Sequence, residues 1–264
     1  MGLRVATWNI NSVRLRLPLL ERLIAERNPD VICLQETKAP DEVFPAEALK
    51  GHGFSHQATL GMKGYNGVAI LSRRPFADVG RKDWCGRQDC RHVWVKLADG
   101  TEIHDLYIPA GGDIPDPAQN EKFAHKLQFL DELAAWMEAE RFHERRAIVV
   151  GDLNIAPLEH DVWSHKELLG VVSHTPVEVE KLARVKAAGR FLDSARHFVP
   201  EGEKLYSWWS YRAKDWLASN RGRRLDHIWL TPGLAGDLKA AATLRDMRGW
   251  EKASDHVAVI ADLG

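Results

Sequence analysis

Short, almost wholly apolar runs alternate along the chain with segments of helical periodicity. Residues 3–10, 30–35 and 147–150 are apolar runs with the length and composition of buried strands. Between the first two, residues 15–27 carry leucines and isoleucine three or four positions apart, and Asn28-Pro29 ends the helix that this spacing predicts. The order strand, helix, strand is typical of a layered α/β protein.

The rest of the chain continues this alternation. Residues 120–142 form the longest predicted helix and residues 178–188 a second one, while residues 67–71 and 93–97 are expected to be a strand pair. Two late apolar runs, residues 228–230 and 257–260, are the last predicted strands. No linker, repeat or biased segment marks a boundary, so residues 1–264 are expected to form one domain.

Polar side chains gather at one end of five of these runs. The first three runs are followed by polar residues, whereas the last two are preceded by them. In chain order, the polar groups are Asn9 with Asn11, Gln35-Glu36, Asp152 with Asn154, Asp226-His227, and Ser254-Asp255-His256. Burying such groups without partners costs several kcal/mol, so they should meet one another. If they meet at one edge, the last two strands run antiparallel to the first three, and the sheet is mixed.

The residue types favour a metal-assisted reaction at phosphate. Carboxylate and amide oxygens without cysteine favour Mg²⁺ or Mn²⁺ over Zn²⁺, and a histidine with an aspartate partner can donate to a phosphate oxygen. Each group also has a simpler interpretation, such as an Asx turn at Asp152 and Asn154 or a surface pair of Glu36 with Lys38. Five such groups together favour hydrolysis of a phosphate ester.

The net charge of −1 means that any nucleic-acid contact requires a local basic surface. Residues 205–225 provide a candidate, because aromatic residues alternate there with cations opposed by the single acid Asp215. The cations are Arg212, Lys214, Arg221, Arg223 and Arg224. Aromatic rings can stack on bases or a sugar-sized gap while arginines neutralise backbone phosphates.

Other classes of protein are disfavoured. No apolar run approaches the roughly 18 residues of a membrane span, and the first residues enter a strand pattern at once, so no signal peptide is expected. Three cysteines are too few for a disulfide framework, which places the protein in a reducing cytoplasm. Cys85, Cys90 and His92 lack a fourth ligand for zinc, Cys33 is expected in the core, and the remaining histidines, including His160, His165 and His174, are expected at the surface or at helix ends.

Six segments in order along the chain carry a family resemblance. They are residues 7–14, 34–38, 64–69, 151–157, 220–222 with 224–226, and 254–256, among them Thr-Trp-Asn-Ile-Asn, Leu-Gln-Glu-Thr-Lys, Gly-Asp-Leu-Asn-Ile-Ala-Pro and Ser-Asp-His. At these residues the chain resembles the exonuclease III family of abasic-site endonucleases, within the deoxyribonuclease I-like endonuclease/exonuclease/phosphatase superfamily. The resemblance implies an α/β, four-layer α/β/β/α sandwich with two packed, mixed and largely antiparallel sheets.

The resemblance also implies a metal site and a general base. Glu36 would be the principal ligand of Mg²⁺, with Mn²⁺ able to substitute, and Asn9, Asp152, Asn154 and Asp255 would surround the metal and the scissile phosphate. Asp152 would activate water and Asn154 would orient that water.

Three further residues gain roles from the resemblance. His256 would contact the scissile phosphate and be held in its tautomer by Asp226, although some superfamily interpretations give the histidine the role of base. The hydroxyl of Tyr107 would meet the phosphate; a half-buried aromatic at a strand end is the alternative.

On the DNA side, the resemblance implies that Trp208 helps to form an abasic pocket, while the adjacent Trp209 fits the core. Further DNA contacts are implied for Arg212, Arg91, Lys122, Asn66, Asn11 and Asn220, with an ordinary solvated face as the alternative for Arg91 and Lys122. The chain departs from the family at Ala110, where Asn or Gln usually touches DNA.

These observations predict a Mg²⁺-dependent DNA phosphodiesterase of base-excision repair. It would cut duplex DNA 5′ to abasic sites, remove 3′-blocking groups including phosphate, and degrade 3′ ends, without a membrane or an obligate protein partner. The alternatives are a phosphatase or phosphodiesterase acting on a phosphorylated small molecule or lipid, an enzyme restricted to DNA 3′ ends, and a DNA-binding protein that has lost catalysis.

Overall fold

The computed structural model describes residues 2–213 and 215–264. Lys214, one of the cations of the basic segment, lies outside the described residues. No helix in these two ranges is long and apolar enough to cross a membrane.

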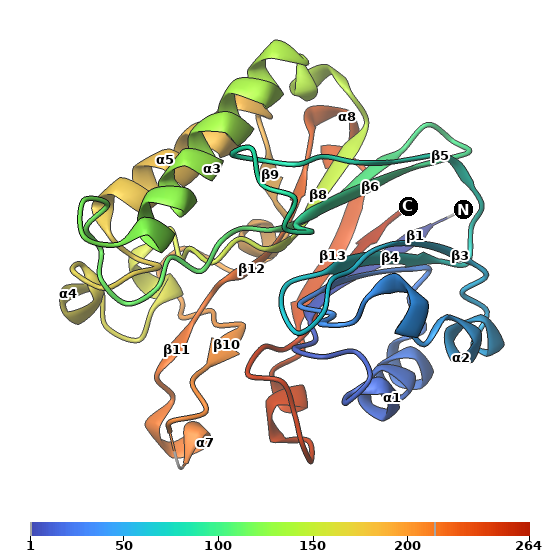
Figure 1. Cartoon of the computed structure of the whole chain (residues 1–264), viewed down its shortest axis with the longest axis horizontal. Helices are drawn as coiled ribbons and strands as arrows, with labels where there is room; N and C mark the ends of the chain where they lie inside the picture. The colour runs from blue at the N-terminus through green and yellow to red at the C-terminus, as the bar shows by residue number, and fades with distance from the viewer. Residues whose placement is uncertain (1, 214) are drawn as a thin grey trace.

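Two six-stranded sheets form the centre of the molecule (Figure 1). The first sheet contains, in spatial order, β13 (Leu238–Thr243), β14 (Val259–Leu263), β1 (Leu3–Asn9), β2 (Val31–Gln35), β4 (Val68–Ser72) and β3 (His56–Leu60). The second contains β5 (Phe76–Arg81), β6 (His92–Leu97), β7 (Glu102–Tyr107), β8 (Ala147–Asp152), β12 (Asp226–Leu230) and β9 (Leu192–Asp193). In each sheet one pair is parallel, β1 with β2 and β7 with β8, and the other pairs are antiparallel.

Helices cover the outer faces of both sheets (Figure 1). Helices α1 (Leu17–Arg27) and α2 (Ala46–Gly51) lie on the first sheet, and α3 (Glu121–Ala139) and α5 (Pro176–Ala188) on the second. The short helices are α4 (His165–Leu168), α6 (Ser194–Phe198), α7 (Trp216–Ser219) and α8 (Pro232–Ala235), and a hairpin is formed by β10 (Trp208–Trp209) and β11 (Gly222–Arg223). The predicted four-layer sandwich of two mixed sheets is confirmed.

The hydrophobic pattern explains the layers. Apolar side chains from both sheets, such as Val5, Val31, Val95 and Ile148, pack between the sheets and are almost fully buried. The other faces of the strands pack under the helices; on α3, for example, Leu130 and its neighbours contact the outer face of the second sheet. Because both faces of the central strands are covered, these strands consist of continuous apolar runs.

Local sequence signals define the helix ends. Asn28 adopts a left-handed conformation (φ 45°) directly after α1, as the Asn-Pro pair predicts. The side chain of Asn120 accepts a hydrogen bond from the backbone N–H of Lys122 at the start of α3. Thr175 and Glu178 form a reciprocal capping box at the start of α5.

One predicted pairing is wrong. Residues 67–71 and 93–97 contain strands β4 and β6, but β4 pairs with β2 and β3, whereas β6 pairs with β5 and β7. The two strands belong to different sheets, and side chains such as Val68 and Val93 belong to the core between them. An apolar run indicates a strand but does not show whether its neighbour bonds at its edge or packs on its face.

The prediction that the remaining histidines lie at the surface or at helix ends is wrong for His104, which is buried within β7. His174 does lie at a helix end, directly before the N-cap of α5, but it is buried there. His174 is 2% exposed, and its Nδ1 lies 2.6 Å from the Ala156 carbonyl oxygen, while its Nε2 lies 2.8 Å from Nδ1 of His165. His174 is buried because the segment after α4 folds back on residues 156–157 and the backbone carbonyl provides its ring with a partner. Cys33 is fully buried, as expected, and among the described residues Cys85 and Cys90 belong to no group suited to a metal.

Candidate active site

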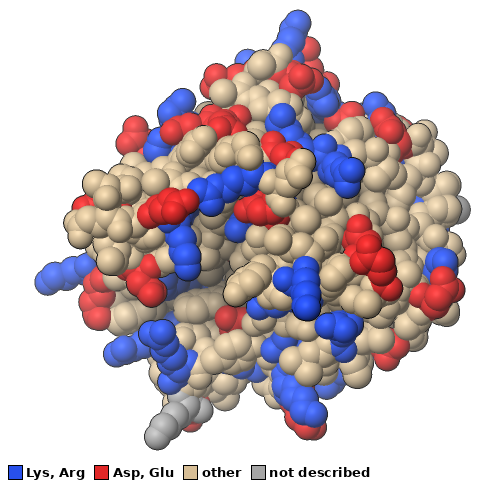
Figure 2. Space-filling model, viewed as in Figure 1, with Lys and Arg blue, Asp and Glu red and all other residues tan. Residues whose placement is uncertain are grey.

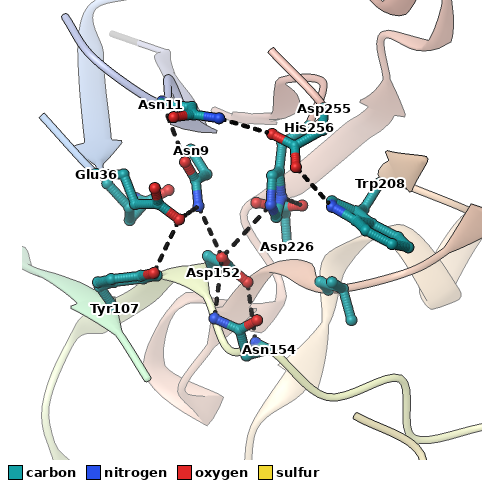
Figure 3. Close-up of polar contacts among 12 residues, drawn as sticks. Asn9, Asn11, Glu36, Tyr107, Asp152, Asn154, Trp208, Asp226, Asp255 and His256 are labelled. Carbon is teal, nitrogen blue, oxygen red and sulfur yellow. Dashed lines mark hydrogen bonds and ion pairs between the residues drawn. The ribbon is translucent and has the colours of Figure 1, made fainter. Parts of the chain in front are cut away.

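Polar side chains from both sheets meet at one end of the sandwich (Figure 3). The late strands run antiparallel to the early ones, as their inverted order of polar and apolar residues predicts. The side chains brought together here are Asn9, Asn11, Glu36, Tyr107, Asp152, Asn154, Asp226, Asp255 and His256.

Asp152 occupies the centre of this group. It ends β8, in register with Tyr107 of β7 and Asp226 of β12. Asp152 Oδ2 accepts hydrogen bonds from Asn9 Nδ2 at 2.8 Å and from Asn154 Nδ2 at 3.1 Å, and Oδ1 accepts one from the Asn154 backbone N–H. Burial disfavours its charged form and raises the pKa of Asp152 to about 7.

His256 pairs with two carboxylates. Its Nδ1 donates to Asp226 Oδ2 at 2.8 Å, and its Nε2 lies 3.7 Å from Asp152 Oδ2. Burial by itself lowers the pKa of His256, but the attraction of Asp226 and Asp152 outweighs it and raises the pKa to about 10. Ser207 Oγ donates to the same Asp226 oxygen at 2.6 Å, which fixes the carboxylate that orients the imidazole.

Glu36 lies on the opposite side of Asn9. Its Oε1 accepts hydrogen bonds from Asn9 Nδ2 at 3.0 Å and from the Tyr107 hydroxyl at 2.8 Å. Its Oε2 lies 2.7 Å from the ammonium of Lys38. Burial raises the pKa of Glu36, but Lys38 and Asn9 outweigh burial, so the pKa lies below its usual value and the carboxylate is charged.

The donor set fits a hard divalent cation. A single amide nitrogen of Asn9 bridges Glu36 and Asp152, so two carboxylates lie close together and repel unless a cation is present. Lys38 places a positive charge beside the carboxylate of Glu36. Oxygen ligands without sulfur are the set that Mg²⁺ or Mn²⁺ prefers. Asn9 presents its nitrogen to the carboxylates and accepts the Asn11 backbone N–H with its oxygen, so here it holds the two acids in place.

Asp152, Asp226 and His256 also lie close enough to be considered as metal ligands themselves. We interpret this trio as a chain of ion pairs, because His256 Nδ1 is occupied by its hydrogen bond to Asp226. The carboxylates of Glu36 and Asp152 are the better candidates for a cation.

A cavity of about 720 Å³ opens beside these residues. Tyr107, Asp152, Asn154 and His256 line its inner end, and the aromatic and basic side chains of Trp163, Trp208, Arg212, Arg221 and Arg223 line its wall. Figure 2 shows basic side chains on both sides of a hollow on this face, with acidic side chains among them. The site therefore combines a buried polar group with an open, partly basic approach.

The predicted DNA-contacting residues separate into two groups. Trp208 and Arg212 line the cavity, and Trp208 Nε1 donates to Asp255 Oδ2 at 3.0 Å. Asn11 donates to Asp255 Oδ1 at 3.1 Å and accepts from Lys38, at the edge of the polar group.

Four other predicted contacts do not line the cavity. Arg91 pairs with Asp89 and lies over the Tyr107 ring, and Asn66 Nδ2 donates to the Asp89 carbonyl oxygen. Lys122 is exposed at the start of α3. Asn220 accepts a hydrogen bond from Nε1 of Trp209, on the core side of the hairpin.

The basic segment contains one structural arginine. Arg224 is 1% exposed, and it donates to Asp161 through Nε and Nη2 and to Asp193 through Nη1. Trp209 is also buried, at 1% exposure, as its core interpretation predicts. Composition shows which residues are basic, whereas the backbone decides which of two adjacent arginines points into the core.

Sequence reasoning missed several supporting residues. Lys126 of α3 is fully buried, forms an ion pair with Glu178 and donates to the carbonyl oxygen of Asn154 at 2.8 Å. A charged residue among the apolar residues of a predicted helix is the signal that could have revealed it. Ser207 and Trp163 belong to no motif that would have identified them.

The chain is similar to known proteins along almost its whole length. The model of the Endonuclease/Exonuclease/phosphatase family matches residues 6–256. Exodeoxyribonuclease III of Haemophilus influenzae is 32% identical over 98% of this chain and 99% of its own length.

Two solved structures are similar over almost the whole chain. One is a 3′ phosphatase from Neisseria bound to a product DNA hairpin, with a TM-score of 0.90, 30% identity and 99% of each chain covered. The other is an AP endonuclease from Archaeoglobus fulgidus, with a TM-score of 0.90, 32% identity and 98% of each chain covered.

Proposed function

The chain belongs to the endonuclease/exonuclease/phosphatase family as an exonuclease III/AP endonuclease-like nuclease, and from that premise we propose that it is a Mg²⁺-dependent DNA-repair phosphodiesterase. It acts on duplex DNA, cuts 5′ to abasic sites and removes 3′-blocking groups and 3′-terminal nucleotides. The observation that carries the proposal is the position of Asp152, buried between His256 and the amide of Asn9 that also binds Glu36.

Asp152 acts as the general base. Burial raises its pKa to about 7, close to the pH at which a general base both accepts and releases a proton readily. Asn154 hydrogen-bonds to both oxygens of Asp152 through its amide and backbone N–H groups and so fixes the carboxylate, and with it the attacking water. The water oxygen adds to phosphorus, the P–O3′ bond breaks, and the released O3′ takes a proton to become a hydroxyl.

His256 and Asp226 stabilise the charge that develops on the phosphate. The protonated imidazole donates through Nε2, and Asp226 keeps it charged and oriented through Nδ1. Tyr107 holds Glu36 through its hydroxyl in this arrangement and turns to a phosphate oxygen when DNA binds.

Glu36 is the principal ligand of the cation, with Asp152, Asn154 and Asp255 around it and Asn9 linking Glu36 to Asp152. When bound, the cation offsets phosphate charge and polarises the scissile bond. Mn²⁺ substitutes for Mg²⁺ because both accept oxygen ligands.

DNA enters the cavity and contacts the side chains that line its wall. Trp208 and the arginines beside it present stacking surface and positive charge, as a nucleic-acid backbone with a displaced sugar requires. Arg212 and Arg221 are exposed and free to reach backbone phosphates. Arg91, Lys122 and Asn66 extend the contact beyond the cavity.

Ala110 is a reason to expect that cleavage at an internal abasic site and removal of groups from a 3′ end differ in efficiency. It is exposed at the cavity margin and cannot form the hydrogen bond of an amide side chain. The similarity to a 3′ phosphatase as well as to an AP endonuclease gives the same reason. Loss of this contact weakens insertion into continuous duplex more than binding at an end.

Three end-labelled duplexes test the proposal: one with an internal abasic analogue, one nicked with a 3′-phosphate, and one blunt. Each is incubated with the protein in Mg²⁺ and, as a control, in EDTA. Metal-dependent incision at the abasic analogue supports the full proposal. Action on 3′ ends alone restricts it to a 3′-phosphatase and exonuclease, and absence of any cleavage contradicts it in favour of phosphorylated small molecules or lipids.

A further inference from the structure

The cavity wall carries a half-buried cation in a mainly aromatic and apolar setting. Arg223 ends β11 and lines the cavity together with Trp208, Leu225 and Val172. Its guanidinium carbon lies 5.2 Å from the centre of the Trp208 ring. An uncharged sugar packs well against aromatic and aliphatic groups, so a cation at this place indicates that an anionic group is recognised in addition to the sugar.

The strand register places Arg223 at a defined distance from the reaction centre. Arg223 pairs with Trp208 across the hairpin, and Trp208 forms a bridge with His256 on its other side. The three backbones therefore lie side by side, and two strand spacings separate Arg223 from His256, roughly 10 Å. The two backbones are therefore near enough for one ligand to contact both side chains.

The guanidinium is fixed but has no acidic partner. Nη1 donates to the Val172 carbonyl oxygen at 2.9 Å and to Ser173 Oγ at 2.7 Å. Within residues 2–213 and 215–264, no carboxylate forms an ion pair with Arg223, and its buried Nε has no acceptor. Burial lowers the pKa of Arg223, and only the distant charge of Glu178 opposes this.

The adjacent arginine shows what a satisfied buried arginine looks like in this protein. Arg224 binds two aspartates with three of its nitrogens. Arg223 lines the cavity, and its Nη2 has no hydrogen-bond partner among the described residues, so an anion from outside the chain would satisfy that donor.

We propose that Arg223 is a specificity-determining residue that binds an anionic group, carboxylate or phosphate, attached on the 3′ side of the scissile phosphate. The inference rests on the proposed function, which places the scissile phosphate at Asp152 and His256. Two substrates supply such an anion: a DNA end blocked by 3′-phosphoglycolate, through its carboxylate, and an internal abasic site, through the next backbone phosphate.

Arg223 takes no part in bond making. In both substrates water adds to phosphorus and the P–O3′ bond breaks, with the electron pair and a proton going to O3′. The phosphate leaves with its anionic substituent, which Arg223 holds. The arginine therefore changes which substrates are processed and leaves the bond-breaking step as it is.

The first experiment compares two blocked ends that differ in charge. One duplex ends in 3′-phosphoglycolate and the other in the hydroxyethyl ester of the same 3′-phosphate, which replaces the carboxylate by a neutral hydroxymethyl group. We expect Arg223→Met to lower kcat/KM for the glycolate by about tenfold or more, the value of one charge-assisted hydrogen bond, and for the neutral ester by less than about twofold. Arg223→Lys should retain part of the preference. The control is Arg221→Met, an exposed arginine of the same cavity wall, which should affect both esters equally.

The second experiment identifies the source of the anion. An internal abasic analogue is prepared with a normal next phosphate or with a neutral methylphosphonate in that place. A penalty of Arg223→Met that appears with the phosphate and disappears with the methylphosphonate supports binding of the backbone anion. A penalty restricted to the glycolate end supports binding of the carboxylate.

A uniform loss on all four substrates, or no loss, overturns the inference while the proposed function stands. Melting temperatures of the variants show whether a uniform loss reflects damage to the loop at Ser173. Failure of the wild-type protein to cleave any of the four substrates contradicts the proposed function itself, so the two failures are distinguishable.

Discussion

The polar group at the strand ends and the hairpin wall beside it are built in opposite ways. Asp152 and Asp226 end neighbouring strands of one sheet, are each 1% exposed, and have several hydrogen-bond partners. In the hairpin segment, as far as residues 205–213 and 215–225 describe it, the regular structure is two short strands and the one-turn helix α7, and Tyr211 and Leu217 are 50% and 59% exposed. The proposed reaction groups are fixed by a sheet, whereas the proposed recognising groups are held by a loop.

This difference has a physical reason. A group that transfers a proton must be held within a few tenths of an ångström and shielded from water, and strands buried on both faces provide this. A surface that receives a long, charged polymer needs area, positive charge and freedom to adjust, and a hairpin provides these at little cost to stability. Substitutions in the two regions should therefore change different quantities.

The largest effect is expected for Asp152→Asn. This change keeps the shape of the side chain but removes the proton acceptor, so kcat should fall by roughly a thousandfold or more. Steady-state cleavage of an abasic duplex measures the loss, and filter binding of the same duplex should show affinity within about tenfold. Cleavage within a few-fold of wild type would show that another group is the base.

Arg224→Met tests the core side of the hairpin segment. Breaking the buried pairs with Asp161 and Asp193 should lower the free energy of unfolding by about 3–5 kcal/mol. The matched variant Arg223→Met, one residue away on the cavity wall, should cost much less. Urea unfolding of both proteins provides the comparison, and equal losses would contradict the distinction between the two arginines.

The Arg224 pairs also predict an acid dependence. Burial raises the pKa of Asp193, but Arg224 and then His227 outweigh it and hold the pKa well below its usual range. A lowered folded-state pKa contributes stability above the unfolded value, about pH 4, and that contribution is lost as the pH falls through the folded value. The stability curves of wild type and Arg224→Met should therefore converge in acid below pH 4, and a constant difference would contradict this.

Asp226→Asn tests the support of the imidazole. Without the carboxylate, His256 loses the main attraction that keeps its imidazole protonated, and it also loses the hydrogen bond that orients the ring. We therefore expect kcat to fall by roughly a hundredfold. Ser207→Ala removes only the 2.6 Å hydrogen bond to Asp226 and should cost about tenfold or less. Single-turnover cleavage of the abasic duplex ranks the two variants, and the reverse order would contradict the proposed support.

The smallest effect is expected on the hairpin wall. Trp208→Ala should raise KM for DNA by about tenfold, because stacking on an aromatic ring contributes roughly 1–3 kcal/mol. Trp208→Phe keeps the ring and removes the hydrogen bond to Asp255, so it separates stacking from support of that carboxylate. A loss in kcat equal to that of Asp152→Asn would place Trp208 with the polar group and remove the contrast between the two regions.

The sequence by itself indicated strands β1, β2, β4, β6, β8, β12 and β14, helices α1, α3 and α5, and the polar residues at the strand ends. The edge strands β3, β5 and β13 were not among its predictions. An apolar run that leads into polar residues, as in Ala147–Asp152, restricts where the end of the strand can lie, because a buried polar group requires hydrogen-bond partners. In the last two strands the polar residues, among them Asp226 and Asp255, come before the apolar run and not after it. This inverted order was sufficient to predict that these strands run antiparallel to the early ones.

Other features depended on contacts between segments distant in the chain. Gln35, the last residue of β2, points between the sheets and donates to Thr7 and Asp105, whereas Glu36 follows the strand in a left-handed conformation (φ 50°) and reaches the polar group. Arg224, directly after β11, donates to Asp161 and Asp193 in the core, whereas Arg223 lines the cavity. Nothing in the order of residues indicates that β4 and β6 belong to different sheets, or that Lys126 would support Asn154. These features depend on which surfaces pack together, and packing is decided only when the whole chain has folded.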